Sequence, residues 1–185
     1  MEMNAVRARR VDGVSSGKRN VYLLGFMAAG KTTVGRTLSR ELGYEFIDVD
    51  EVIEQRVGRS IREIFREHGE SYFRQLEKQL IAEISTRDGV VVALGGGSYV
   101  DEENRRIALA TGTCVFLDTP LDLIRSRLKD HDTRPLARGP DELGNLLNSR
   151  LPSYLQADLR VSGKGTPEET VVAILAELRR SGRIR

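Results

Sequence analysis

The residue types best suited to chemistry lie in a glycine-rich segment between an apolar run and a helical pattern. The segment Gly25–Thr32 reads GFMAAGKT and follows the apolar run Val21–Leu24. Its spacing matches the Walker A pattern, in which backbone N–H groups surround phosphates, the lysine contacts the outer phosphates and the hydroxyl binds Mg²⁺. Such a loop requires a strand before it and a helix after it, as found here. The segment therefore predicts a phosphate-binding loop rather than a flexible turn with a surface lysine.

Two carboxylates follow the next apolar run and are candidates for chemistry beside that loop. The run Tyr44–Asp50 predicts a strand that ends in Asp48 and Asp50, and the carboxyl ends of parallel strands form the ligand crevice in open α/β sheets. One carboxylate could hold Mg²⁺ or its water, and the other could orient a hydroxyl that attacks a phosphoryl group. Alternatively, Asp50 only caps the helix that follows, and the spacing leaves both interpretations open.

Arg74 and Glu77 are three residues apart in a helical pattern, so they share one side of the predicted helix. Arg74 could bind a carboxylate through its forked guanidinium, while Glu77 holds it in place or meets a substrate hydroxyl. The commoner alternative is an ordinary exposed ion pair. Further along, the three consecutive glycines Gly95, Gly96 and Gly97 follow a buried apolar run. Glycines at a strand end favour a ligand that approaches the backbone closely.

The region after the fourth apolar run combines a helix start with a stretch that lacks any apolar pattern. Asp118 ends that run and resembles the aspartate that many phosphate-loop proteins place near magnesium. However, Thr119 and Pro120 favour a simple charge at a helix N-terminus. The apolar pattern lapses over residues 129–140, which predicts a mobile lid. Arg134 within it could close over the transferring phosphate and exclude water.

Short apolar runs alternate along the chain with helical patterns, which is typical of a parallel sheet covered by helices. We therefore expect an α/β fold, a three-layer α/β/α domain. The predicted strands are 21–24, 44–50, 89–94, 113–117 and 159–161, and the predicted helices are 31–42, 51–56, 60–84 with an interruption at 68–71, 121–128, 141–149 and 167–179.

The 185 residues show no break in composition and predict one domain over residues 20–180. Residues 1–19 hold five basic and two acidic side chains, and residues 179–185 hold four arginines, so the net charge of +2 arises from the two ends. We interpret 1–19 as a disordered basic extension and 181–185 as a basic, solvated tail, neither with a function of its own.

Cysteine usage and the length of the apolar runs bear on location. The lone Cys114 lies inside an apolar run, so it predicts a small buried hydrophobe and excludes a disulfide framework. No apolar run approaches the roughly 18 residues that cross a bilayer, and the N-terminal segment lacks the apolar core of a secretory signal. We expect a cytoplasmic monomer with neither a nucleic acid nor a membrane as partner.

Taken together, these motifs closely resemble those of the shikimate kinases over residues 20–178. Besides the phosphate loop, the segments that carry the resemblance are Phe46–Asp50, Glu54–Ile61, Phe73-Arg74, Leu94–Gly97, Thr133–Leu136 and Arg150–Tyr154. The resemblance implies a P-loop fold like that of the nucleoside monophosphate kinases, with a five-stranded parallel sheet. It also implies transfer of the γ-phosphoryl group of ATP, with Mg²⁺, to the 3-hydroxyl of shikimate. The products would be shikimate 3-phosphate and ADP, in chorismate and aromatic amino-acid biosynthesis.

The resemblance implies a role for each matching residue. Lys31, Asp50 and Arg134 would be catalytic, with Asp50 on the attacking hydroxyl. Thr32 and, through water, Asp48 would hold Mg²⁺. The residues implied to contact the nucleotide are Gly25, Ala28, Ala29, Gly30, Lys31, Thr32, Thr33, Arg127, Arg134 and Pro167. The residues implied to contact shikimate are Asp50, Phe65, Arg74, Glu77, Gly95, Gly96, Gly97 and Arg150.

Three of these residues have a more specific role in the family. Arg74 and Arg150 would bind the carboxylate of shikimate, and Arg127 would stack on adenine. One position departs from the family, which usually has glycine where this chain has Ala28. A methyl group there is accommodated if φ is negative and causes strain if φ is positive, with weaker nucleotide binding as the expected consequence.

Two other functions remain open at this point. A kinase for another small hydroxy acid, such as gluconate, would share the loop and the fold but should not need Arg74 and Arg150 together with three glycines. A nucleotide-dependent switch would belong to a different class. The sequence lacks the Asn-Lys-x-Asp motif that reads guanine, which disfavours the switch.

Overall fold

The computed structural model describes residues 20–129 and 140–184. Within them, five strands form one sheet in the order β2-β3-β1-β4-β5, and every neighbouring pair is parallel. The strands are β1 (Asn20–Leu24), β2 (Glu45–Asp48), β3 (Val90–Ala93), β4 (Gly112–Asp118) and β5 (Leu159–Ser162). The five-stranded parallel sheet is therefore confirmed. Because β1 lies in the middle of the sheet, the loop that follows it opens at the centre of the carboxyl edge.

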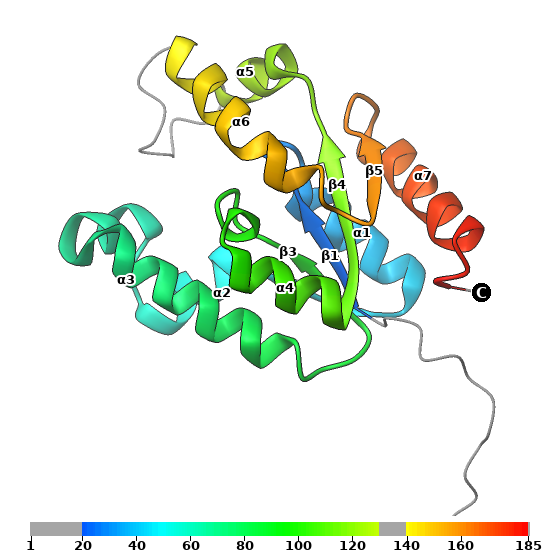
Figure 1. The fold of residues 1–185 in the computed structure, drawn as a ribbon, viewed down its shortest axis with the longest axis horizontal. Coiled ribbons are helices and arrows are strands. Elements are labelled where there is room, and N and C mark those ends of the chain that lie inside the picture. Colours follow the sequence, from blue (N-terminus) through cyan, green and yellow to red (C-terminus); the bar gives the residue numbers. More distant parts are fainter. Residues whose placement is uncertain (1–19, 130–139, 185) are drawn as a thin grey trace, which may run out of the picture.

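Helices cover both faces of this sheet, so the three-layer arrangement is also confirmed (Figure 1). The helices are α1 (Lys31–Leu42), α2 (Val49–Val57), α3 (Ile61–Ile84), α4 (Glu102–Thr111), α5 (Leu121–Lys129), α6 (Pro140–Tyr154) and α7 (Pro167–Arg180), with a short 3₁₀ helix η1 (Ser98–Val100). One apolar core joins the sheet to α1 and α7, and a larger one joins it to α2, α3, α4, α5 and α6. Of the described residues, no helix is both long and apolar enough to cross a membrane.

Local capping interactions set several of the helix boundaries. Asp48 ends β2 and its side chain accepts hydrogen bonds from the first backbone N–H groups of α2. Ser60 opens α3 with a reciprocal capping box to Glu63, and Thr166 opens α7 with a second one to Glu169. These bonds satisfy N–H groups that a helix leaves without partners at its N-terminus.

The structure corrects two predicted boundaries that matter for function. The strand β2 stops at Asp48, so Asp50 lies in the first turn of α2 rather than at a strand end, and the capping residue is Asp48. The helix α6 continues past the predicted end at residue 149 to Tyr154 and carries Arg150 on its last turn. By contrast, the predicted interruption of the 60–84 helix is present, as a kink at Gly69.

The described part of the C-terminal tail packs against the fold, which corrects the prediction of a solvated tail. Arg183 forms an ion pair of 3.0 Å with Asp158 and donates a hydrogen bond of 3.1 Å to Thr113 at the start of β4. The other carboxylate oxygen of Asp158 accepts a hydrogen bond of 2.9 Å from the backbone N–H of buried Cys114. Asp158 therefore joins β4 to the chain end.

We expect the substitution Asp158→Ala to lower the free energy of unfolding by about 2 kcal/mol, because it leaves a buried backbone N–H without an acceptor and releases Arg183. Urea unfolding followed by circular dichroism measures this loss. As a control, Asp118→Ala removes an exposed ion pair to Arg160 and should cost less than about 1 kcal/mol. Equal costs for the two variants would contradict a structural role for Asp158.

Candidate active site

The phosphate loop lies at the carboxyl edge of the sheet, between the end of β1 and the start of α1. Its first residue, Gly25, has a φ of 143°, and a Cβ there would lie 2.9 Å from the carbonyl oxygen of Leu117. Only glycine fits that backbone and that space. Gly30 precedes α1, and no side chain caps this helix. The first N–H groups of α1 are thus left for an anion, as a phosphate-binding loop requires.

Lys31 folds back over the same loop. It is buried, and its ammonium group donates hydrogen bonds of 3.0 Å to the carbonyl oxygen of Gly25 and 2.9 Å to that of Phe26. Both bonds hold the charge within the curve of the loop. A negatively charged phosphate in the loop would therefore meet a cation that is already in place.

The sequence left open whether Ala28 has a negative or a positive φ, and the structure gives it a positive φ, which is strained for alanine. Its φ is 56°, the one positive φ of a non-glycine residue in the part of the chain that the structure describes. Arg127, from α5, donates a hydrogen bond of 3.0 Å to the carbonyl oxygen of Ala28. The left-handed conformation costs an alanine about 1 kcal/mol, and this bond from Arg127 helps to hold it.

A cavity of about 470 Å³, here called the phosphate-loop cavity, extends from the loop to the start of α7. Most of the residues predicted to contact a nucleotide line it, namely Ala28, Ala29, Gly30, Lys31, Thr32, Thr33, Arg127 and Pro167. Gly163 and Gly165, from the loop after β5, also line it. Arg134 and most of the predicted lid lie outside the described residues.

A second cavity of about 560 Å³, here called the arginine cavity, lies between the loop, α2, α3 and α6. All of the residues predicted to contact a second substrate line it, namely Asp50, Phe65, Arg74, Glu77, Gly95, Gly96, Gly97 and Arg150. These residues come from four separate parts of the chain. The fold brings these four parts together, although they are far apart in sequence.

The two cavities meet at Thr32, Asp48 and Asp50, which line both of them. Thr32 donates a hydrogen bond of 2.6 Å from its hydroxyl to one oxygen of Asp48. The other oxygen of Asp48 accepts from the backbone N–H of Asp50 at 3.0 Å. Asp48 therefore fixes both the hydroxyl next to Lys31 and the helix turn that carries Asp50.

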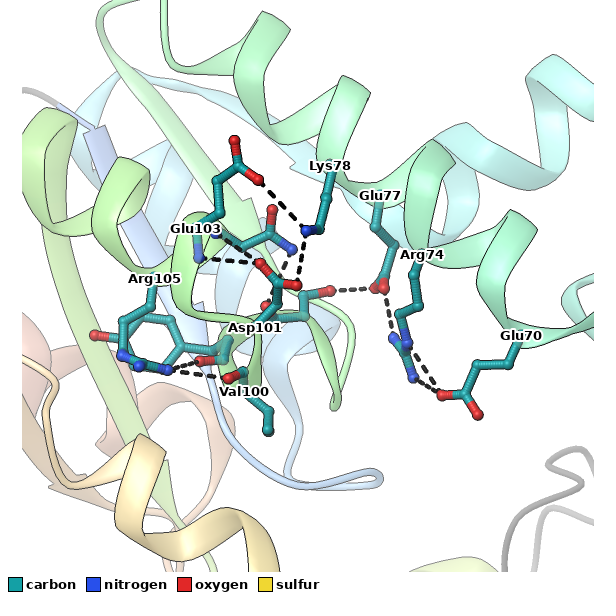
Figure 2. A network of polar contacts seen from close by, with 11 residues as sticks. Glu70, Arg74, Glu77, Lys78, Val100, Asp101, Glu103 and Arg105 are labelled. Atoms are coloured by element: carbon teal, nitrogen blue, oxygen red, sulfur yellow. Dashed lines mark hydrogen bonds and ion pairs between the residues drawn. The ribbon is translucent and has the colours of Figure 1, made fainter.

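Arg74 pairs with the buried carboxylate of Glu77, so the two do not form the exposed ion pair that the spacing favours. Glu77 is fully buried, and it accepts hydrogen bonds from the guanidinium of Arg74 and from the hydroxyl of Ser98 (Figure 2). Burial raises the pKa of the Glu77 carboxyl, and the nearby positive charge of Arg74 opposes that shift. The position of Arg74 is thus fixed from inside the protein.

The glycine segment makes room for these charged side chains. A Cβ on Gly95 would lie 2.7 Å from a carboxylate oxygen of Glu77 and 2.9 Å from one of Asp50, and a Cβ on Gly97 would lie 2.6 Å from the Arg74 guanidinium. Real Cβ atoms do not approach so closely, so side chains at these positions would displace the charged groups. Gly95 and Gly97 thus allow Asp50, Glu77 and Arg74 to pack against the backbone itself.

Two residues that contact the predicted site residues were not predicted from the sequence, Ser98 and Tyr154. Ser98 is buried and follows the glycines, where no periodic pattern marks it. Tyr154 is buried and donates its hydroxyl to the carbonyl oxygen of Gly96, while Arg150, four residues earlier, lies over the same glycine. If the predicted helix had been extended to residue 154, Arg150 and Tyr154 would have been expected on one face of it.

Sequence comparison assigns the family. The family model described as shikimate kinase matches residues 27–179. A curated shikimate kinase from Persephonella marina is 45% identical over 163 residues, which cover 87% of this chain and 99% of that protein. The chain belongs to the shikimate kinase family.

Solved structures agree with this family assignment. A shikimate kinase from Acinetobacter baumannii in complex with shikimate has a TM-score of 0.84 and 36% sequence identity, and the alignment covers 90% of this chain and 96% of that one. A gluconokinase from Sinorhizobium meliloti reaches a TM-score of 0.58 at 18% identity, with 88% and 93% of the two chains covered. This second likeness shows a shared fold alone. The shikimate kinase family thus accounts for the sequence as well as the fold.

Proposed function

We propose that this protein transfers the γ-phosphoryl group of ATP to the 3-hydroxyl of shikimate, giving shikimate 3-phosphate and ADP. The observation that carries the proposal is the junction of the two cavities at Thr32, Asp48 and Asp50. One cavity has the groups that bind phosphates, and the other has two guanidinium groups suited to a carboxylate. A phosphoryl group at the junction would reach an acceptor held in the arginine cavity.

Asp50 is the group that we assign to the attacking hydroxyl. It lies in the first turn of α2, and Asp48 supplies the cap, so the carboxylate of Asp50 is not needed for capping. From the junction it can orient the hydroxyl and accept its proton as the bond to phosphorus forms. Arg74 and Arg150 would hold the carboxylate of shikimate, which sets the distance between that hydroxyl and the phosphate.

The groups at the junction fit Mg²⁺. The Thr32 hydroxyl and an Asp48 carboxylate oxygen lie 2.6 Å apart beside Lys31, and Mg²⁺ prefers such oxygen ligands together with waters and phosphates. When bound, the ion would neutralise phosphate charge. Thr32 would hold it directly and Asp48 through water, while Lys31 would stabilise the transferring group.

The first experiment measures ADP release by the purified protein with ATP and Mg²⁺, alone, with shikimate and with gluconate. We expect release that depends on shikimate and does not rise with gluconate, because gluconate is an open chain that would not match the fixed arginine pair. ADP release that gluconate stimulates and shikimate does not would favour a gluconate kinase. ADP release that neither compound changes would favour a nucleotide-dependent switch. We also propose that the enzyme acts as a monomer in the cytoplasm.

A further inference from the structure

The helix α3 has a kink at Gly69, just before the turn in which Glu70 pairs with Arg74. Gly69 has φ 80° and ψ 172°, a backbone conformation that is essentially restricted to glycine. A Cβ on Gly69 would meet nothing within 4 Å, so the glycine is required by the backbone and not by space. The second half of α3 begins directly after it, at Glu70. Glu70 therefore lies one helical turn before Arg74 and on the same side.

Arg74 is held by carboxylates on two sides. Glu77 accepts from its Nη1, while Glu70 accepts from its Nε at 3.2 Å and its Nη2 at 2.9 Å, so Glu70 forms a two-pronged contact (Figure 2). The two carboxylates differ in exposure, because the side chain of Glu77 is 0% exposed and that of Glu70 is 57% exposed. The guanidinium is thus fixed by one carboxylate from the protein interior and by one from the solvent side.

Glu70 does not belong to the arginine cavity. Arg74 and Glu77 line that cavity and Glu70 does not. The Cζ and both Nη atoms of Arg74 lie over Gly97, which does line the cavity. Glu70 therefore holds Arg74 from outside the cavity lining, while Arg74 itself lines the cavity.

We propose that Glu70 is a positioning residue for carboxylate recognition, acting through Arg74. The inference rests on the proposed function, in which Arg74 binds the acceptor's carboxylate. An arginine side chain has many rotamers, and binding is weakened when they must be ordered at the moment of association. Glu70 and Glu77 restrict the guanidinium before the acceptor arrives. The opposite effect, repulsion of the acceptor by the Glu70 charge, is reduced because Glu70 is exposed and screened by solvent.

The test compares steady-state kinetics of the full-length enzyme with Glu70→Ala and Glu70→Gln. We expect the KM for shikimate to rise roughly three- to fivefold in Glu70→Ala, the range that an exposed ion pair supports. The kcat and the KM for ATP should stay unchanged, which a general loss of folding would not produce. The KM for shikimate of Glu70→Gln should lie between that of the unsubstituted enzyme and that of Glu70→Ala. The matched control is Glu67→Ala, an exposed glutamate on the other side of the kink that pairs with Arg66.

A second variant shows whether Glu70 acts through the arginine. In an Arg74→Met background no cation remains for Glu70 to hold, so adding Glu70→Ala should leave the KM for shikimate unchanged. A lower KM in the single Glu70→Ala variant would overturn the proposal in favour of competition between Glu70 and the acceptor, and an unchanged KM would overturn it as well. If the unsubstituted enzyme shows no shikimate-dependent ADP release, the proposed function fails. If it shows release but the variants match it, only the role of Glu70 fails.

Discussion

Replacing Asp50 with asparagine should lower kcat about 10²- to 10⁴-fold, the usual contribution of a positioned acid or base. The amide keeps the size and shape of the carboxylate but cannot accept the proton of the attacking hydroxyl. Asp50 lines both cavities at their junction, and it is the group assigned to the attacking hydroxyl, so this substitution tests the proposed chemistry directly. We expect the KM values for ATP and shikimate to change little, because Arg74, Arg150 and the phosphate loop are left intact.

The structure separates this effect from a helix-capping effect. Asp48, not Asp50, accepts the capping hydrogen bonds of α2, so Asp50→Asn should leave the circular dichroism spectrum and the unfolding midpoint nearly unchanged. Asp122→Asn, at a highly exposed position on α5, serves as the matched control and should keep full turnover. If Asp50→Asn retained the kcat of the unsubstituted enzyme, Asp50 could not be the group that activates the hydroxyl.

The local sequence pattern was sufficient to predict the phosphate loop. Its chemistry depends on backbone N–H groups and one lysine within a single turn, so spacing alone identifies Gly25, Lys31 and Thr32, and the structure places Lys31 in that turn. The alternation of apolar runs and helical patterns likewise predicted the layered fold, because each run or pattern is a local signal, although helix α4 was not predicted.

The arginine cavity shows where local pattern fails. Arg150 reaches Gly96 from α6, and the spacing around it gives no signal, because the contact depends on how α6 crosses the carboxyl edge of the sheet. Only the family resemblance suggested it. For Glu77 the local spacing gives a signal, but an ambiguous one, because a surface ion pair with Arg74 would have the same spacing. Its burial follows from the packing of α3 against η1 and the hydroxyl of Ser98, which no local pattern encodes.

Ala28 illustrates a third limit. The family resemblance singles out this residue, because the family usually has glycine there. Whether its methyl group is tolerated depends on the sign of φ, a property of the folded loop. The observed φ of 56° places this alanine where glycine is favoured. Its carbonyl oxygen accepts the hydrogen bond from Arg127, which is ninety-nine positions away along the chain. The conformation of a residue in the phosphate loop is thus stabilised from a distant helix.

Replacing Lys31 with methionine should lower kcat roughly 10²- to 10³-fold, the loss expected when one positioned charge or donor at a reacting centre is removed. Methionine has nearly the length of lysine and keeps the apolar stem, so the ammonium group is the main difference. In the structure this group lies within the curve of the loop, on the carbonyl oxygens of Gly25 and Phe26. A transferring phosphoryl group at the cavity junction would lose its nearest fixed positive charge.

Nucleotide binding provides a second measurement for the same variant. A ligand that binds only the folded state raises the unfolding temperature, so the rise caused by ADP and Mg²⁺ should be smaller in Lys31→Met than in the unsubstituted enzyme. Lys78→Met is the matched control, because Lys78 is a half-exposed lysine of α3 that pairs with Asp101 at 3.0 Å. It should keep both turnover and the full rise. A Lys31→Met enzyme with normal kcat would show that the loop binds phosphate through its backbone alone, and the positive charge assigned to the transfer step would have to come from elsewhere in the chain.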